Sequence, residues 1–395
     1  MTKLWNKGGQ KLHPAIEKYT VGNDAELDQT LVGYDCLASI AHAKMLGKIG
    51  ILNQSEVTKL QSGLNQIIKL HEQGKFKVKT TDEDSHTAIE NFLTKKLGTV
   101  GKKIHTGRSR NDQILVVLRL YTLDRLNIIT NQTNQLIKHI NQKAKDNRQV
   151  KMPGYTHTQK AMPTTVGIWL NSFAGALSDD LLLLSTANKI INQNPLGSIA
   201  GFGEQALGLD RDFTTKELRF AKTQTNPIYC AYSRGKFENI VLQALSQVML
   251  DLGKLANDLV LFTTQEFGFF DLPNEFKSGS SVMPQKKNFD ILELIRGNTS
   301  IFLGYQFQIQ GIIQNLISGY NRDFQLTKEP YLKAINLSMA TIEIFSLIIK
   351  NLEVKINNLE LACTDELCAT EKAYKLVKKG IPFRDAYRQI GNKFK

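Results

Sequence analysis

The chain has 395 residues, enough for two or three domains around a large buried core. Apolar residues make up 42% and charged residues 22%, which is typical of globular domains and excludes long disordered tracts. The formal charge of +13 comes mostly from scattered lysines. Because no dense basic block with interleaved aromatic residues occurs, nucleic acid is not expected as a partner.

The cysteines and the hydropathy pattern narrow the class further. Cys36, Cys230, Cys363 and Cys368 form no CxxC pair, which argues against a zinc site and a disulfide framework. The first five residues contain no apolar signal core, and no run of about 18 apolar residues occurs. We therefore expect a cytoplasmic protein without a membrane partner.

Residues 1–110 are predicted to form an N-terminal, loop-rich helical domain. Apolar residues at helical spacing predict helices over 35–49, 55–71 and 84–97. Ser55 is the expected cap of the second helix.

Residues 111–352 are predicted to form a central bundle of long helices. Apolar periodicity predicts helices over 112–144, 164–188, 236–266, 289–316 and 330–352. Within 236–266 the spacing alternates between four and three residues, which is the pattern of helices packed nearly parallel or antiparallel. The residues of this seam are Val241, Leu245, Val248, Leu252, Leu255, Leu259 and Phe262. Such a seam indicates core packing, and a bundle of this kind often continues into the core of an oligomer.

Residues 353–395 are predicted to form a small C-terminal helical domain, with helices over 368–379 and 383–391. Gly380 and Pro382 interrupt the pattern between them. Strand signals are scarce throughout. The expected fold is therefore mainly α, an elongated central bundle flanked by two smaller helical domains.

Residues 279–288, Gly-Ser-Ser-Val-Met-Pro-Gln-Lys-Lys-Asn, carry the densest chemistry in the chain. The Gly-Ser-Ser start predicts a mobile loop with two hydroxyls. Pro284 suits the first turn of a helix, so we expect a helix start that presents Lys286 and Asn288 to an anion. An ordinary Ser-rich loop before a helix is the alternative interpretation.

Two further segments offer polar groups near predicted helix ends. In 105–112, Arg108 and Arg110 can pair with carboxylates, and Asp112 can cap the following helix. The alternative is a charged capping loop. In 153–159, read as a turn followed by a helix, His157 lies among hydroxyls and an amide, as a proton carrier would. A lone histidine is, however, more often structural.

Two loops complete the set of candidates. Residues 194–203 are Gly-rich but follow no predicted strand, so they are no dinucleotide fingerprint. Residues 319–330 form a polar break between two long helices, a place that often binds ligands, although a plain connector is the alternative. The chain shows no metal-ligand cluster, nucleophile elbow or phosphate-binding lysine motif. This inventory suits polar, carboxylate-bearing substrates and proton transfer without a cofactor.

Together these segments resemble the aspartase/fumarase superfamily. Residues 279–288 match its signature loop, Gly-Ser-Ser-x-Met-Pro-x-Lys-x-Asn, and Glu293 falls where the superfamily keeps a Glu. Within it the chain resembles the argininosuccinate lyase family. That resemblance is carried by DEDSHTAIE (82–90), TGRSRND (106–112), GYTHTQ (154–159), GYNRDFQLTKEP (319–330) and GIPFRDAY (380–387).

The chain also departs from the family pattern. Phe289 stands where Pro is usual, and 198–203 differs from the commoner Gly-rich version. Residues 232–237 lack the acidic residues that most relatives carry, and the Asn23-Asp24 region lacks the usual Ser contact to the substrate. The chain stops soon after Gly391, where relatives continue for a further small helical piece.

The resemblance implies a C–N lyase of arginine biosynthesis that reversibly eliminates fumarate from argininosuccinate and leaves arginine. It implies Ser280 as the base, Lys286 and Asn288 as stabilisers of the intermediate, and His157, oriented by Glu293, as the acid. His157 acting as base with water is the rival assignment. The expected substrate-binding residues are His86, Arg110, Asn111, Thr156, Tyr320, Gln325 and Lys328.

The family assembly implied is a homotetramer whose active sites are each built from three subunits. No cofactor and no metal are implied. Two alternatives stay open at this point. One is another superfamily lyase, of the adenylosuccinate lyase or fumarase type, and the other is an inactive structural relative.

Overall fold

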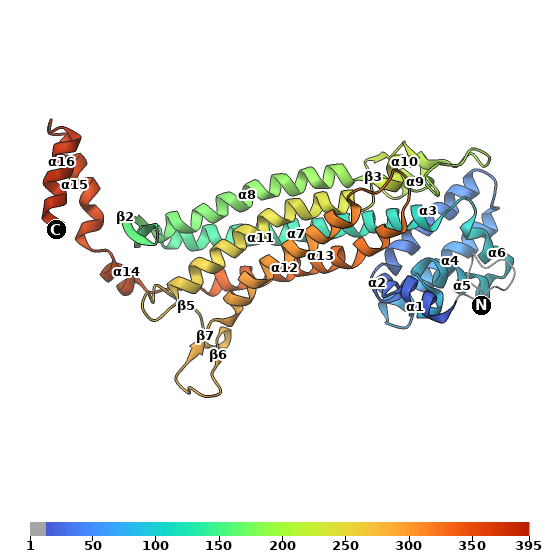
Figure 1. Cartoon of the computed structure of the whole chain (residues 1–395). Coiled ribbons are helices and arrows are strands. Elements are labelled where there is room, and N and C mark those ends of the chain that lie inside the picture. The colour runs from blue at the N-terminus through green and yellow to red at the C-terminus, as the bar shows by residue number, and fades with distance from the viewer. Residues whose placement is uncertain (1–12, 395) are drawn as a thin grey trace. The chain divides into compact units, whose positions relative to one another are not determined.

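The computed structural model describes residues 13–394, and the chain is mainly helical (Figure 1). The chain divides into two compact units. Unit 1 comprises the residues up to Ile128, Leu184–Ala244 and Gly304–Asn336, and unit 2 comprises Ile129–Leu183, Leu245–Leu303 and the residues from Leu337 onward. The division into domains at residues 110 and 352 stays a prediction.

The five longest helices each contribute residues to both units: α7 (Arg110–Asp146), α8 (Val166–Ile191), α11 (Lys236–Phe262), α12 (Asp290–Ile313) and α13 (Lys328–Asn351). Unit 1 also holds α1 (Pro14–Val21), α2 (Asp24–Gln29), α3 (Val32–Lys48), α4 (Gln54–Glu72), α5 (Ser85–Leu97), α6 (Thr99–Lys102), α9 (Arg211–Glu217) and α10 (Pro227–Tyr232). Unit 2 also holds α14 (Ile356–Ala362), α15 (Ala369–Val377) and α16 (Phe383–Gly391).

Short 3-10 helices connect these elements: η1 (Thr80–Asp82), η2 (Lys103–His105), η3 (Asn274–Phe276), η4 (Arg322–Thr327), η5 (Asp365–Cys368) and η6 (Asn392–Phe394). The strands form two-stranded pairs. They are β1 (Lys151–Thr156) with β2 (Gln159–Thr165), β3 (Gln193–Asn194) with β4 (Lys222–Thr223), β5 (Phe270–Asp271) with β8 (Glu353–Val354), and β6 (Ser278–Gly279) with β7 (Lys287–Asn288). The β3–β4 pair is parallel, and the other three are antiparallel.

The structure confirms that the fold is mainly α and contains all ten predicted helices, with boundaries shifted by a few residues. The heptad seam of α11 is buried, with every one of its seven side chains at most 6% exposed. In unit 1, helices α3, α4 and α5 enclose a separate apolar core that includes Leu46, Leu60, Leu64 and Leu93. Residues of α5, including Ala88 and Ile89 in its first two turns, pack into this core, and part of the candidate site lies at the start of this helix.

Three local predictions were wrong. The cap of α4 is Asn53, not Ser55, because Asn53 and Glu56 form a reciprocal capping box. Asp112 is not the N-cap residue of α7, which begins at Arg110. Its Oδ1 accepts the Ser109 N–H at this helix start at 2.9 Å, and its Oδ2 accepts the N–H groups of Gly197 and Ile199 and fixes the Gly-rich loop. Six short helices, α1, α2, α6, α9, α10 and α14, were not predicted, since each is too short to show an apolar period.

Two of the polar segments that were predicted to begin helices form β-hairpins. Residues 151–165 form the hairpin β1–β2, not a turn followed by a helix. The signature loop is held in the hairpin β6–β7, and α12 begins only at Asp290, so Lys286 and Asn288 are not at a helix start. Pro284 lies in the hairpin loop, outside any helix. Figure 1 shows this hairpin extending from the beginning of α12.

Candidate functional site

Three ionisable side chains of unit 1 lie at the N-terminus of α5. Asp84 is the N-cap of α5, because its Oδ1 accepts the Thr87 N–H at 2.8 Å. Glu83, just before it, has a φ of +70°, which is strained for a residue other than glycine. His86 follows in the first turn of the helix. Glu83, Asp84 and His86 all line one cavity.

Arg110, the first residue of α7, lies against this turn. Its Nη1 and Nη2 donate to Glu83 Oε2 at 3.0 and 3.1 Å, and Nη2 also donates to Thr87 Oγ1 at 2.8 Å. Its Nε lies 3.2 Å from Asp84 Oδ2. The guanidinium predicted to hold a substrate carboxylate is thus already paired with two protein carboxylates, and a substrate must exchange with one of them. Arg108 instead faces the interior and donates to Ser39 Oγ at 2.8 Å.

His86 is fixed from behind by a buried carboxylate. Its Nδ1 lies 2.6 Å from Asp35 Oδ2, and the same oxygen accepts the Ser85 hydroxyl at 2.9 Å. Burial by itself opposes charge on both side chains. The attraction between them outweighs burial, so the pKa of His86 is raised and the pKa of Asp35 is lowered. Both shifts favour the ionic form of the pair, an imidazolium beside a carboxylate, at the cavity wall.

Lys328, the first residue of α13, reaches two carboxylates of α2. Its Nζ lies 2.5 Å from Asp28 Oδ1 and 3.1 Å from Asp24 Oδ1. Burial lowers the pKa of Lys328, but Asp28 and Asp24 outweigh it and the net shift is upward. Burial likewise raises the pKa of Asp24, against the opposing effect of Lys328. These i, i+4 carboxylates on one short helix fix the ammonium group at the edge of the cavity.

The 319–330 segment closes another side of the cavity. The Thr20 carbonyl oxygen accepts hydrogen bonds from Arg322 Nη2 and from Gln325 Nε2, each at 3.0 Å. These bonds tie η4 to the end of α1. Tyr320 packs its ring against Phe324 with a centroid distance of 6.2 Å. The polar break between α12 and α13 is thus an ordered wall of the cavity.

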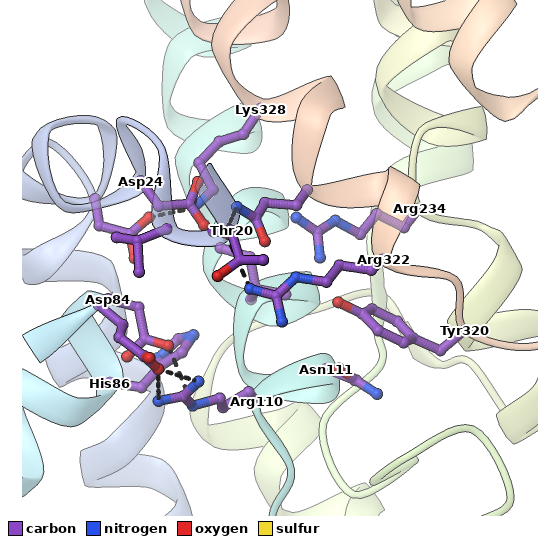
Figure 2. Close-up of a pocket in the computed structure, with 15 residues that line it drawn as sticks. Thr20, Asp24, Asp84, His86, Arg110, Asn111, Arg234, Tyr320, Arg322 and Lys328 are labelled. Carbon is purple, nitrogen blue, oxygen red and sulfur yellow. Dashed lines mark hydrogen bonds and ion pairs between the residues drawn. The ribbon is translucent and has the colours of Figure 1, made fainter. Parts of the chain in front are cut away.

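Figure 2 shows the resulting cavity, which has a volume of about 240 Å³. Six of the seven predicted substrate-binding residues line it: His86, Arg110, Asn111, Tyr320, Gln325 and Lys328. The prediction did not include six charged residues that also line it, namely Asp24, Asp28, Glu83, Asp84, Arg234 and Arg322. Glu83, Asp84 and Arg322 lie inside motifs already recognised. Asp24 and Arg234 lie in segments that were noted only as departures from the family pattern, and Asp28 gave no sequence signal.

The signature loop lies in unit 2 and has a defined internal geometry. Ser280 Oγ accepts the backbone N–H of Met283 at 3.0 Å and that of Val282 at 3.3 Å. Two N–H groups aimed at one oxygen stabilise negative charge on it. The loop is closed by a turn in which the Lys286 N–H donates to the Met283 carbonyl oxygen at 3.1 Å. The N–H dipoles of Val282 and Met283 therefore both point at Ser280 Oγ.

The two lysines of the loop differ in their surroundings. Lys287 Nζ donates to Asn274 Oδ1 at 2.7 Å, whereas the Lys286 ammonium group has no partner among residues 13–394. Lys286, Asn288 and Glu293 line one cavity together with the end of α11. Phe289 forms the base of the loop, where Lys277 Nζ lies 5.2 Å from its ring centroid. The structure thus groups two of the predicted catalytic residues, Asn288 and Glu293, in one cavity with the unpaired Lys286.

His157 occupies the tip of the hairpin β1–β2. Thr156 pairs with Gln159, so His157 and Thr158 form a two-residue turn with φ values of +51° and +60°. Both values are strained for residues other than glycine. The His157 side chain is exposed, and no hydrogen bond within the described part of the chain joins it to Glu293. The predicted orientation of His157 by Glu293 thus has no support within one chain.

The hairpin is anchored by an aromatic cluster of unit 2. Tyr155, two residues before His157, packs against Phe262 and Phe267 with centroid distances of 6.1 and 5.9 Å. Trp169 contacts Phe262 and donates its indole N–H to Asp258 Oδ2 at 3.0 Å. The aromatic packing of Tyr155 thus fixes the hairpin whose turn contains His157.

The predicted site residues therefore fall into two groups. His86, Arg110, Asn111, Tyr320, Gln325 and Lys328 belong to unit 1. Thr156, His157, Ser280, Lys286, Asn288 and Glu293 belong to unit 2. Within residues 13–394, no group of three or more His, Cys, Asp or Glu side chains is arranged to hold a metal ion.

One stretch, residues 322–351, is long and apolar enough to cross a membrane by length and composition alone. Half of its most apolar window is buried inside the protein, so it passes the same test that the core helix of a globular protein passes. The four cysteines are free thiols.

Comparison with known proteins identifies the family. The family model described as "Lyase" matches residues 13–304. An argininosuccinate lyase of Thermotoga neapolitana is 46% identical over 392 residues, covering 99% of this chain and 98% of that protein. An argininosuccinate lyase of Phocaeicola vulgatus is 40% identical, covering 98% of this chain and 87% of that protein.

Solved structures agree on the fold. An EDDS lyase in complex with formate superimposes with a TM-score of 0.82 at 24% identity, covering 97% of this chain and 76% of that one. A class II fumarase from Schistosoma mansoni gives a TM-score of 0.81 at 16% identity, covering 98% and 91%. At these identities the likeness concerns the fold alone. From the sequence relatives and the family match, we conclude that the chain belongs to the lyase family and, within it, to the argininosuccinate lyases.

Proposed function

We propose that the protein catalyses the reversible elimination of argininosuccinate to L-arginine and fumarate, a step of arginine biosynthesis. In this reaction a base removes a proton from the succinyl carbon next to a carboxylate. The bond between the neighbouring carbon and the guanidino nitrogen then breaks, and arginine leaves with the protonated nitrogen. The intermediate adds negative charge to a group that is already anionic, so the enzyme must supply cations and N–H donors.

The observation that carries the proposal is the charge balance of the unit 1 cavity. Its lining holds four carboxylates, Asp24, Asp28, Glu83 and Asp84, and four cationic side chains, Arg110, Arg234, Arg322 and Lys328. His86 also lines the cavity, and any charge on it is balanced by Asp35 behind it. A site for a small dicarboxylate such as malate requires cations and gains nothing from this many carboxylates. A ligand that carries both positive and negative charges, such as the zwitterionic arginine half of argininosuccinate, matches a cavity lined by both carboxylates and cations.

Ser280 is proposed as the base. A serine hydroxyl is a poor base in water, and its conjugate oxyanion needs stabilising dipoles. The N–H groups of Val282 and Met283 already point at Ser280 Oγ. Lys286, without a partner in the described chain, supplies a cation on the same loop, and Asn288 supplies an amide donor. Closure of the loop over the substrate would exclude water and strengthen these interactions.

His157 is proposed to protonate the leaving guanidine. Histidine titrates near neutral pH, as a group that gives up and regains a proton in each cycle must. Its exposed position on a strained, rigidly anchored turn leaves the imidazole free to meet a ligand. Thr156, on the same hairpin, is proposed to hold a succinyl carboxylate together with Asn111.

We further propose a cytoplasmic homotetramer in which several subunits share each site. The supporting observation is that six of the seven proposed substrate-binding residues lie in unit 1, whereas His157 and the Ser280 loop lie in unit 2, which contains only Thr156 of that set. Helix α12 also exposes large apolar side chains, including Leu294 and Phe307, at 62% and 67%. Faces of this kind are usually covered by other subunits.

A direct comparison of substrates tests the proposal. The purified protein is incubated separately with argininosuccinate, adenylosuccinate and malate, and product formation is followed. We expect turnover of argininosuccinate and little or none of the other two. Preferential turnover of adenylosuccinate or malate would assign the chain to another lyase of the superfamily, and inactivity toward all three would indicate a structural relative.

A further inference from the structure

The buried charge cluster at the edge of the unit 1 cavity contains one carboxylate that the fold does not require. Asp28 is 1% exposed; its Oδ1 lies 2.5 Å from Lys328 Nζ, and its Oδ2 accepts the Ser85 N–H at 3.0 Å. Both oxygens of Asp28 are therefore engaged. Asp24 makes only the longer, 3.1 Å contact with the same ammonium group. Lys328 thus stays paired even without Asp24.

Asp24 offers an unused acceptor to the cavity. Its Oδ1 faces Lys328, and no other group of residues 13–394 hydrogen bonds to its carboxylate. Asp24 lines the cavity, and burial raises its pKa. A partly desolvated carboxylate with a free oxygen is stabilised by a second cation. The described chain supplies none that contacts it directly, so a ligand cation fits there.

A second observation points to an anionic group beside that cation. Arg234 is 4% exposed and lines the same cavity, and its Nε has no hydrogen-bond partner among the described residues. A buried guanidinium N–H without a partner is costly unless a ligand satisfies it. In Figure 2 the Lys328 side chain reaches Asp24, and the Arg234 side chain extends toward the cavity from the other side of the view. A free carboxylate oxygen of Asp24 and an unsatisfied N–H of Arg234 thus line one pocket.

An ammonium and a carboxylate on one carbon match this arrangement. Building on the proposed function, we propose that Asp24 binds the α-ammonium group of the arginine half of the substrate and thereby sets the preference for an α-amino acid. Lys328 and Arg234 hold the adjacent α-carboxylate. Asp24 is a specificity-determining residue and takes no part in proton transfer, so its loss changes KM for the amino acid far more than kcat.

The reverse reaction isolates this contact. Fumarate is supplied with either arginine or 5-guanidinopentanoate, which is arginine without its α-amino group, and kcat and KM are measured for each. We expect the wild-type protein to prefer arginine by roughly 10- to 100-fold in kcat/KM, the usual value of a hydrogen bond to a charged group. In Asp24→Asn we expect this preference to fall to about threefold or less, mainly through KM for arginine, with KM for 5-guanidinopentanoate little changed.

The matched control is Glu26→Gln, which removes an exposed carboxylate from the same helix and should keep the wild-type preference. Asp24→Glu keeps the charge and should retain part of it. An Asp24→Asn variant that folds and prefers arginine as strongly as the wild type would overturn the assignment. If neither Asp24→Asn nor Asp24→Ser folds, an inhibition assay on the wild-type protein replaces the variants. Arginine should inhibit argininosuccinate cleavage more strongly than 5-guanidinopentanoate does, and equal inhibition by the two compounds would overturn the Asp24 assignment.

Failure of the proposed function is a separate result. In that case the wild-type protein would not join arginine to fumarate at all. Failure of the Asp24 assignment leaves this reaction intact: the wild-type protein still joins arginine to fumarate, and either Asp24→Asn keeps the preference for arginine or the wild type shows no such preference.

Discussion

At the scale of single residues, Ser280 and Ser281 are adjacent hydroxyls with different surroundings. Ser280 Oγ accepts two backbone N–H groups, and Ser281 is exposed. We expect Ser280→Ala to lower kcat by about 10²- to 10⁴-fold, the usual contribution of a positioned base. Ser281→Ala serves as the control and should stay within a few-fold of the wild type. Steady-state cleavage of argininosuccinate measures both, and equal activity of the two variants would show that the base has been misassigned.

The His86–Asp35 pair is expected to stabilise the folded state within a limited pH range. Removing one partner of a buried ion pair costs about 3–5 kcal/mol, so Asp35→Asn should lower the unfolding free energy by that order. The raised pKa of His86 makes its contribution complete below about pH 6.5 and lost as the pH rises through the folded value. The lowered pKa of Asp35 makes its contribution present above about pH 3.9 and lost as the pH falls through the folded value.

The difference in stability between wild type and Asp35→Asn should therefore be largest between about pH 4 and 6.5. Denaturant unfolding at a series of pH values measures it. A difference that grows steadily above pH 7 would contradict an ionic His86–Asp35 pair.

At the scale of elements, the strain in the β1–β2 turn should be measurable. Thr158 is a β-branched residue at a φ of +60°, a conformation that glycine adopts without a steric penalty. We expect Thr158→Gly to raise the unfolding free energy by about 1 kcal/mol, the lower end of what such strain costs. The midpoint of denaturant unfolding checks this, and a clear destabilisation would show that Thr158 side-chain contacts outweigh the backbone strain.

The packing of α6 against α5 depends on a glycine. A Cβ added at Gly101 would lie 2.4 Å from the Leu93 carbonyl carbon and oxygen, whereas a Cβ at Gly33 in α3 meets nothing within 4 Å. Gly101→Ala should destabilise the protein by roughly 1–3 kcal/mol, because backbone atoms must move. Gly33→Ala should be neutral or stabilising by up to about 1 kcal/mol. Unfolding midpoints of the two variants test the contrast, and equal values would argue against this close approach.

The elements also show where sequence reasoning succeeds and where it does not. Long helices such as α11 were predictable, because an apolar seam over many turns has one interpretation. The hairpins β1–β2 and β6–β7 were not. Strands β6 and β7 have only two residues each, and β1 and β2 each contain a proline and show no strict alternation of apolar and polar residues. The six cavity residues of unit 1 were named through family motifs. Asp24 and Asp28 were missed because their role depends on Lys328, 300 residues away, and no local pattern encodes that contact.

At the scale of the whole molecule, the proposal requires assembly. The mass in solution should be four times the chain mass of 44.4 kDa, which light scattering measures. Phe307→Asp places a charge on an apolar side chain that is 67% exposed in the single chain and should lower both the mass and the activity. A monomeric wild type with full activity would contradict shared sites.

Mixing two inactive variants tests the sharing of sites more closely. Ser280→Ala alters a residue of unit 2, and Asn111→Ala alters one of unit 1. If different subunits supply these residues to one site, hybrids formed by unfolding and refolding the mixture contain some sites with both residues intact. We expect the hybrids to regain turnover that neither variant shows alone. Hybrids of demonstrated mixed composition that remain inactive would mean that each site takes both residues from one subunit.

The proposed reaction is an elimination that yields arginine and fumarate in equal amounts. The most direct test is to measure both products when the wild-type protein acts on argininosuccinate. Arginine and fumarate are quantified together over time, and the same end point is approached from arginine plus fumarate. We predict equal amounts of the two products at all times and a common equilibrium from both directions. Arginine released without matching fumarate, or no arginine at all, would contradict the account.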